Sequence, residues 1–305
     1  MEYFFSLLFK IIPLYFLILL GYLASKNKNI TKETISALLI YFLAPVVVFH
    51  GVITMDLRPE LLTLPFLMYG LCTLAALVFY FIGKLFWKDG HKNILAFAAS
   101  QGNAGYFGIP VAIILFGEDI LGIYLFLWVG AYIFGFTGGY LVVANGKHSL
   151  SESLRKFAKV PVLYAFILAL ALNYLGVGLD ESILSITGKF TGAYTILGMM
   201  ILGLNLSNLK RTSLDWPFTI WAMISRFIFW PLLAYLVIKL DQNYWHLYNE
   251  TIYQLLILIS IVPIAADTVV FATEFKIHPQ KVALTVLIST LFALVYIPTA
   301  LYLAF

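Results

Sequence analysis

The feature that most constrains this chain is a long uncharged segment interrupted by helix-breaking residues. No Lys, Arg, Asp or Glu occurs between Lys92 and Glu118, and a bilayer is spanned by about 20 apolar residues. The centre of the segment, residues 101–110, reads QGNAGYFGIP, and its glycines and proline loosen or break a helix. Hydrocarbon offers no hydrogen-bond partners, so a backbone opened at this depth must line a cavity or be covered by protein. The segment therefore predicts an interrupted transmembrane helix, as used at the binding sites of secondary transporters.

The rest of the chain has the composition of an integral membrane protein. It is 62% apolar and 11% charged, whereas an ordinary soluble domain has about 25% charged residues. Its fold class is predicted to be all-α, with ten transmembrane helices. Hydropathy places them at 3–24, 31–53, 61–87, 93–116, 120–143, 160–178, 183–207, 214–239, 251–273 and 281–304.

The basic residues predict the orientation of these helices. Of the 19 Lys and Arg residues, 14 lie in the odd-numbered loops and two in the even-numbered loops. The positive-inside rule then puts the odd loops in the cytoplasm and both termini outside. The basic loop at 144–159 separates a first repeat, 1–143, from a second, 160–305, and we expect it to contact anionic lipid. With five helices in each repeat, the second must be inserted upside down relative to the first.

Four stretches resemble the auxin efflux carrier family, which includes plant PIN proteins and bacterial carriers. They are LAPVVVFHGV at 43–52, GNAGYFGIPVAIILFG at 102–117, RFIFWPLLAY at 226–235 and the stretch at 263–298 beginning PIAADTVVFATEFKIHPQ. The resemblance implies the fold of bile-acid sodium symporters, with two inverted five-helix repeats. It also implies broken fourth and ninth helices that cross at mid-membrane at Pro110 and Pro263, elevator-type movement, homodimers and small organic anions as substrates.

The broken helices predict the substrate site. A helix N-terminus carries about half a positive charge, so two N-termini at one depth can hold a carboxylate. Asn103 can both donate and accept hydrogen bonds; alternatively, it only satisfies the opened backbone. Likewise the prolines could be simple kinks, and His50 a structural hydrogen bonder. The candidate substrate-binding residues are Gly102, Asn103, Gly105, Pro110, Pro263, Ala265 and His50.

Asp267 is the candidate residue for ion coupling. A carboxylate near the bilayer centre costs about 2.5–3.5 kcal/mol, so it should face a cavity. It stands where plant members of the family carry an apolar residue. It could carry a proton, bind sodium with opened backbone carbonyls, or cap the second half of the ninth helix. Arg226 is expected to pair with a buried carbonyl or carboxylate, with a substrate counter-ion role as the alternative.

These patterns predict a secondary transporter of small organic anions in the cytoplasmic membrane of a bacterium, with a proton as the candidate coupling ion. The alternatives are a sodium-coupled symporter and a membrane receptor that does not transport. No enzyme motif occurs and Cys72 stands alone, so we expect no enzyme, cofactor or metal site. The net charge of +4 lies in loops and predicts no nucleic-acid partner. The aromatic residues are expected mainly to face lipid or pack at the membrane interfaces, and not to form a ligand cage.

Overall fold

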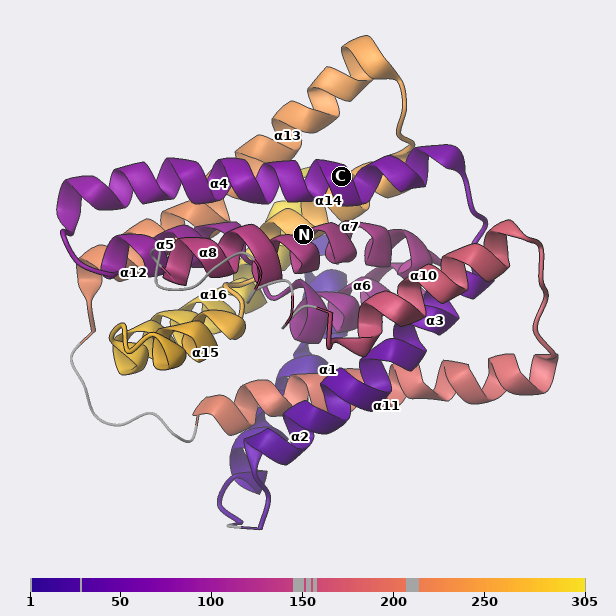
Figure 1. Ribbon diagram of the computed structural model, residues 1–305, viewed down its shortest axis with the longest axis horizontal. Helices are drawn as coiled ribbons and strands as arrows, with labels where there is room; N and C mark the ends of the chain where they lie inside the picture. Colours follow the sequence, from indigo (N-terminus) through magenta and orange to yellow (C-terminus); the bar gives the residue numbers. More distant parts are fainter. Residues whose placement is uncertain are drawn as a thin grey trace.

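The computed structural model describes residues 2–27, 29–144, 151, 155, 158–206 and 214–304. Within these ranges the chain is helical and contains no strand, only one isolated β-bridge (Figure 1). Most of the predicted basic loop at 144–159, with Lys147, lies outside the described residues, as do Lys210 and Arg211.

Six described helical segments are long and apolar enough to cross a membrane. They are Glu2–Ala24, Lys32–Thr54, Pro59–Phe86, Glu118–Ala144, Trp216–Trp245 and Pro279–Ala304. Three shorter apolar helices accompany them, at Ala104–Phe116, Pro161–Tyr174 and Glu250–Ile261. The protein is therefore an all-helical integral membrane protein, while the count of ten spans in inverted repeats stays a prediction.

Several long helices contain π-helical turns that the sequence did not predict. These turns are Leu39–Leu43, Ala104–Gly108, Gly135–Gly139, Ser225–Phe229 and Asp241–Trp245. A π-helical turn loosens the hydrogen-bond ladder locally and often occurs at functional sites. Two of these turns, Ala104–Gly108 and Ser225–Phe229, carry residues of the candidate site described below.

The helices form two groups (Figure 1). In the first group, α1 (Glu2–Ala24) packs along α11 (Glu181–Leu206), and α10 (Pro161–Tyr174) packs against α3 (Ala44–Thr54), which follows α2 (Lys32–Leu38). Helix α10 ends at Tyr174, before the predicted end at 178, because Gly176 takes a left-handed conformation with φ 68°. Such a residue terminates a helix.

The second group contains the remaining helices. Its members are α4 (Leu64–Phe86), α5 (His91–Ser100), α6 (Ile109–Phe116), α7 (Leu121–Phe134), α8 (Tyr140–Ala144), α12 (Trp216–Ile224), α13 (Trp230–Leu240), α14 (Glu250–Ile261), α15 (Asp267–Glu274) and α16 (Pro279–Ala304). Short 3-10 turns, Pro59–Thr63 and Glu118–Ile120, precede α4 and α7. An apolar cluster joins α5 to α15, where the rings of Phe97 and Phe271 meet edge to face at 4.7 Å.

Two glycines allow the backbones of α1 and α11 to approach closely. A Cβ atom at Gly21 would collide with the Met200 carbonyl, and one at Gly203 would collide with the Ile18 carbonyl. Small residues that bring backbones together are a common way of packing membrane helices. The two helices are therefore locked by contacts that side-chain movement cannot relieve.

Gly203→Ala is expected to destabilise the protein by about 1–3 kcal/mol, the usual cost of overpacking. The measurement is the thermal unfolding midpoint of the purified protein in detergent. Gly192→Ala is the matched control, because Gly192 lies on the same helix and a Cβ there meets nothing within 4 Å. Equal midpoints for the two variants would contradict the close packing of α1 on α11.

Candidate functional site

The predicted fourth and ninth spans are both interrupted, and the interruptions contact each other. Helix α5 ends at Ser100 and the helix resumes at Ala104, while α14 ends at Ile261 and α15 begins at Asp267. The Asn103 N–H donates to the Pro263 carbonyl at 2.7 Å, and the Ala265 N–H donates to the Gln101 carbonyl at 3.0 Å. Around them Gly102 and Ile264 form an antiparallel bridge. The two openings thus satisfy much of each other's backbone, as a buried site requires.

The position of the first interruption differs from the expectation. The family resemblance implied a break at Pro110, but the helix opens at residues 101–103 and Pro110 lies buried in the first turn of α6. Proline is tolerated in a first turn because its missing N–H is not needed there. The π-helical turn Ala104–Gly108 precedes Pro110 and already weakens the backbone hydrogen bonding of the helix. In the ninth span Pro263 does lie within the interruption.

Arg226 caps the C-terminal end of α14, where the second interruption begins. Its side chain is 1% exposed, and it donates to the carbonyls of Ile259 at 3.1 Å, Ser260 at 3.4 Å and Val262 at 3.1 Å. The guanidinium also lies 5.0 Å from the ring centre of Trp230. The last carbonyls of a helix lack partners within the helix. A buried carbonyl or a carboxylate was the predicted partner of Arg226, and the structure shows carbonyls. A Cβ atom at Gly102 would collide with this guanidinium, which requires glycine at that position.

A cavity of about 80 Å³ lies beside the paired interruptions. Both openings contribute to its wall, through Gly102, Asn103, Ala265 and Asp267. The wall is completed by aromatic side chains from four elements, Tyr106, Trp128, Tyr132 and Tyr194 among them. The volume exceeds the roughly 10–15 Å³ that one water molecule needs, so a small ligand or several waters fit.

Polar groups in this cavity lack protein partners. The amide nitrogens Nε2 of Gln101 and Nδ2 of Asn103 are buried and make no hydrogen bond with the described residues. The Asp267 side chain is exposed to the cavity, and no described residue donates to its carboxylate. Buried polar groups are nearly always paired, so this wall is complementary to a polar ligand.

The helix ends around the cavity add positive potential. The segment beginning at Ala104 and helix α15 beginning at Asp267 both start at its wall. The first N–H groups of a helix lack intrahelical partners, and the N-terminus attracts negative charge. Asp267 itself occupies one of these favourable positions.

The structure brings together five of the eight predicted site residues. Gly102, Asn103, Gly105, Ala265 and Asp267 line the cavity. The other three do not line it. Pro110 is inside α6, Pro263 contributes its carbonyl to the backbone pairing, and the Nδ1 atom of His50 lies 2.9 Å from the Thr187 hydroxyl of α11.

Sequence reasoning missed Gln101 and the aromatic wall. The aromatic residues were expected mainly to face lipid or the membrane interfaces, and many do lie exposed, such as Phe66 and Tyr174. Tyr194, at 1% exposed, and Trp128, at 7% exposed, instead lie inside the protein. Gly105 explains part of this arrangement, because a Cβ there would lie 3.2 Å from Trp128 Nε1 and 3.4 Å from the Tyr194 hydroxyl. The glycines within residues 102–108 indicated that other parts of the protein pack closely against this segment. Which residues pack there could not be predicted, because they come from distant parts of the sequence.

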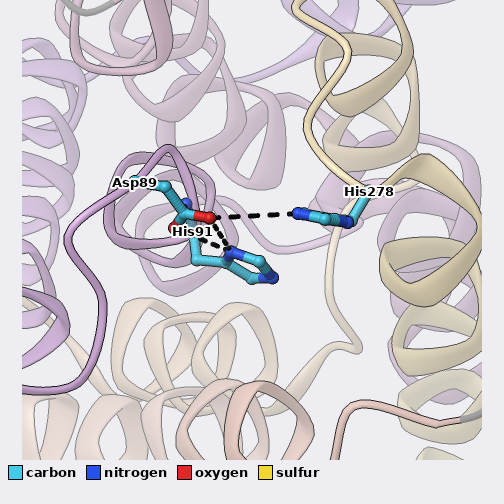
Figure 2. A group of neighbouring side chains, drawn as sticks. All are labelled: Asp89, His91 and His278. Carbon is cyan, nitrogen blue, oxygen red and sulfur yellow. Dashed lines mark hydrogen bonds and ion pairs between the residues drawn. The ribbon is translucent and has the colours of Figure 1, made fainter.

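A second polar cluster lies where the loops before α5, α12 and α16 meet. His91 Nδ1 lies 2.8 Å and 3.0 Å from the two carboxylate oxygens of Asp89, and His278 Nε2 lies 3.9 Å from Asp89 Oδ2 (Figure 2). Partial burial raises the pKa of Asp89, but the hydrogen bonds from His91 and the charges of both histidines outweigh it and lower the pKa overall. The pKa of His278 is lowered, first by burial and then by the nearby charges of His91 and Lys281.

Long apolar helices around a cavity with polar residues in its wall are the architecture that a membrane transporter requires. Comparison with known proteins agrees: a family model described as membrane transport protein matches residues 6–153 and 147–301. The chain belongs to this family, which confirms its resemblance to auxin efflux carriers.

Two archaeal relatives cover almost the whole chain. An uncharacterized transporter of Methanocaldococcus jannaschii is 30% identical over 294 residues, spanning 92% of this chain and 93% of the relative. An uncharacterized transporter of Methanothermobacter thermautotrophicus is 25% identical over 291 residues, with the same shares covered. The family and these relatives indicate a membrane transporter and not an enzyme.

Proposed function

We propose that the protein is a secondary transporter of small organic anions, above all carboxylates, and that Asp267 couples their movement to a proton. The observation that supports this most directly is that Gln101 and Asn103, whose buried amide nitrogens have no partner among the described residues, line the same cavity as Asp267. The substrate carboxylate would accept hydrogen bonds from these amides. The helix N-terminus at Ala104 would stabilise its charge without a basic side chain.

Asp267 makes the proposal specific. An anionic substrate entering a cavity that already contains an ionised carboxylate meets a like charge in a medium of low dielectric constant, where repulsion is strong. Binding is therefore favoured when Asp267 is protonated or paired with a cation. Proton coupling follows if the carboxylate is neutralised by a proton. A sodium-coupled symporter follows if a sodium ion pairs with the same carboxylate instead.

The arrangement of the helices supports alternating access by an elevator movement. One group of helices, with α1 and α11, would be the scaffold, and the group that carries both interruptions would move. A second cavity of about 220 Å³ shares Ala266 with the first and extends between α11 and α16 to Lys32 and Gln280. Lys32 and Gln280 adjoin odd-numbered loops of the predicted topology, so this cavity would be the cytoplasmic route to the site.

The wider architecture remains part of the proposal. The two family matches, 6–153 and 147–301, divide the chain close to the predicted boundary at 144–159. That division supports two inverted five-helix repeats with crossing helices. The cytoplasmic membrane, external termini and a homodimer are proposed on the basic-residue pattern and the family resemblance.

Saturable uptake of labelled mono- and dicarboxylates into proteoliposomes tests the proposal. In Asn103→Ala the half-saturating substrate concentration is expected to rise about 10- to 100-fold, since a hydrogen bond to a charged group contributes about 1.5–3 kcal/mol. The backbone pairing of residue 103 with Pro263 is retained in this variant. Asn243→Ala, at an exposed asparagine, is the control and should transport normally. Binding without flux in the native protein would indicate the receptor instead, and unchanged kinetics in Asn103→Ala would refute the proposed site.

A further inference from the structure

The cluster of Asp89, His91 and His278 has the ligand types and spacing of a metal site. One nitrogen from each histidine and one oxygen from Asp89 all lie within 4.8 Å of one another. Figure 2 shows the Asp89 carboxylate reaching both imidazole rings, which come from chain segments far apart in the sequence. In a tetrahedral zinc site with bonds of about 2.0–2.1 Å, neighbouring ligand atoms lie roughly 3.4 Å apart. The observed separations fall on both sides of that value. Because the rings of His91 and His278 stack with their centres 4.2 Å apart, both imidazoles would rotate to direct their nitrogen lone pairs at one ion.

A second carboxylate lies beside His91. Its Nε2 atom is 3.4 Å from Asp215 Oδ2 without forming a hydrogen bond to it, and Asp215 is itself held by Lys281 Nζ at 3.3 Å and by the Phe218 N–H at 3.2 Å. Histidines that bind metals almost always direct their other ring nitrogen to a carboxylate or a carbonyl. A small rotation of the His91 ring would give Nε2 that contact while Nδ1 faces Asp89.

The Asp89 carboxylate lies against Nδ1 of His91. When Nδ1 carries the ring proton, it donates to the carboxylate. When Nδ1 presents its lone pair, a cation is needed between the two groups, and a metal ion bound by both would supply it. His278 supplies a third donor on the open side, because its side chain is 47% exposed and that of Asp89 is 59% exposed.

There is also room for further ligands. A cavity of about 260 Å³ adjoins Asp89, Asn93, Lys276 and His278. Three protein ligands and a position left for water or a small anion are typical of accessible zinc sites. Nitrogen and carboxylate donors together suit Zn²⁺ better than Ca²⁺ or Mg²⁺, which prefer oxygen ligands only.

We propose that Asp89, His91 and His278 bind a divalent transition-metal ion, with Zn²⁺ as the best fit, and that Asp215 positions His91 for it. The ion would join the start of α5 to the turn between α15 and α16, on the helices that carry the two interruptions. His278 is held in a left-handed conformation with φ 43°, which is uncommon outside glycine and directs its ring toward Asp89. This site is separate from the cavity at Asp267 and does not depend on the proposed substrate.

Titration calorimetry with ZnCl₂ tests the site on tag-free full-length protein that has been freed of metal with a chelator. The native protein is expected to bind one equivalent saturably, and Zn²⁺ should raise its unfolding midpoint by mass action. In His278→Asn the affinity should fall at least tenfold. In Asp215→Asn it should fall about 10- to 100-fold, the range known for partners of metal-bound histidines.

The control is His246→Asn, which changes another histidine with positive φ in a different loop and should bind Zn²⁺ as the native protein does. Co²⁺ binding provides an independent measurement. Co²⁺ bound by histidine ligands has a visible absorption spectrum, and His278→Asn should lose that absorption. No saturable binding by the native protein would overturn the proposal. Equal affinity in the native protein and His278→Asn would overturn it as well, and would leave a hydrogen-bonded cluster stabilised by protons.

Discussion

Asp267→Asn is expected to abolish the response of transport to an imposed ion gradient while leaving the protein folded. Asparagine has nearly the same shape as the acid but neither releases a proton nor carries a negative charge. Because Asp267 is exposed to the cavity and no described residue donates to it, the substitution breaks no structural hydrogen bond. Stimulation by the gradient should fall at least tenfold, while exchange of substrate across the membrane continues.

The measurement compares proteoliposomes with proton, sodium and no gradients, at matched membrane potential. Glu274→Gln, at the opposite end of α15, is the control and should keep its coupling. The gradient that stimulates the native protein identifies the coupling ion. Full gradient-driven flux in Asp267→Asn would show that Asp267 takes no part in coupling, and would leave the amide contacts of Asn103 to be tested separately.

Arg226→Met should be the most destabilising single change considered for this fold. The substitution leaves the carbonyls of Ile259, Ser260 and Val262 without their buried donor, and each unsatisfied buried group costs about 1–3 kcal/mol. The interruption of the ninth span would lose the charge that caps α14, so we expect a loss of roughly 3 kcal/mol or more in unfolding free energy. Thermal unfolding in detergent measures this loss.

Two further arginine variants make the result specific. Arg226→Lys keeps the charge but not the planar fork that reaches several carbonyls, so its stability should be intermediate. Arg58→Met removes an arginine whose ion pair with Glu60, at 3.2 Å, is partly exposed, and should change stability by only about 0.5 kcal/mol. If Arg226→Met and Arg58→Met had the same thermal unfolding midpoint, the capping role of Arg226 would be disproved.

The features that could be predicted from sequence share one property: they are local. Long apolar runs predicted the membrane helices because backbone groups in hydrocarbon must bond within their own helix. The Gly-rich stretch near Asn103 and the proline at Pro263 predicted two interruptions for the same reason. Arg226 was expected to pair with a buried carbonyl or carboxylate because a charge in an apolar segment needs a buried partner.

The errors arose where a local signal was read without its neighbours. Pro110 looked like the breaking residue, but proline breaks a helix only if its position needs an N–H, and the π-helical turn before it removes that need. The aromatic residues looked like lipid-facing side chains because a hydropathy pattern does not distinguish a wall of tyrosines around a cavity from a surface in lipid.

By itself, then, the sequence determined that this is a helical membrane protein of the transporter family. It also determined that two of its helices are interrupted and that one carboxylate, Asp267, lies where a charge near the bilayer centre costs free energy. The family resemblance implied that the two interruptions cross, but only the tertiary structure decided which groups pair there, through hydrogen bonds between Asn103 and Pro263 and between Gln101 and Ala265. It also decided that Tyr194 closes the cavity and that His278 reaches Asp89. The physical reason is that helix formation depends on nearby residues, whereas a site forms from side chains that only packing brings within bonding distance.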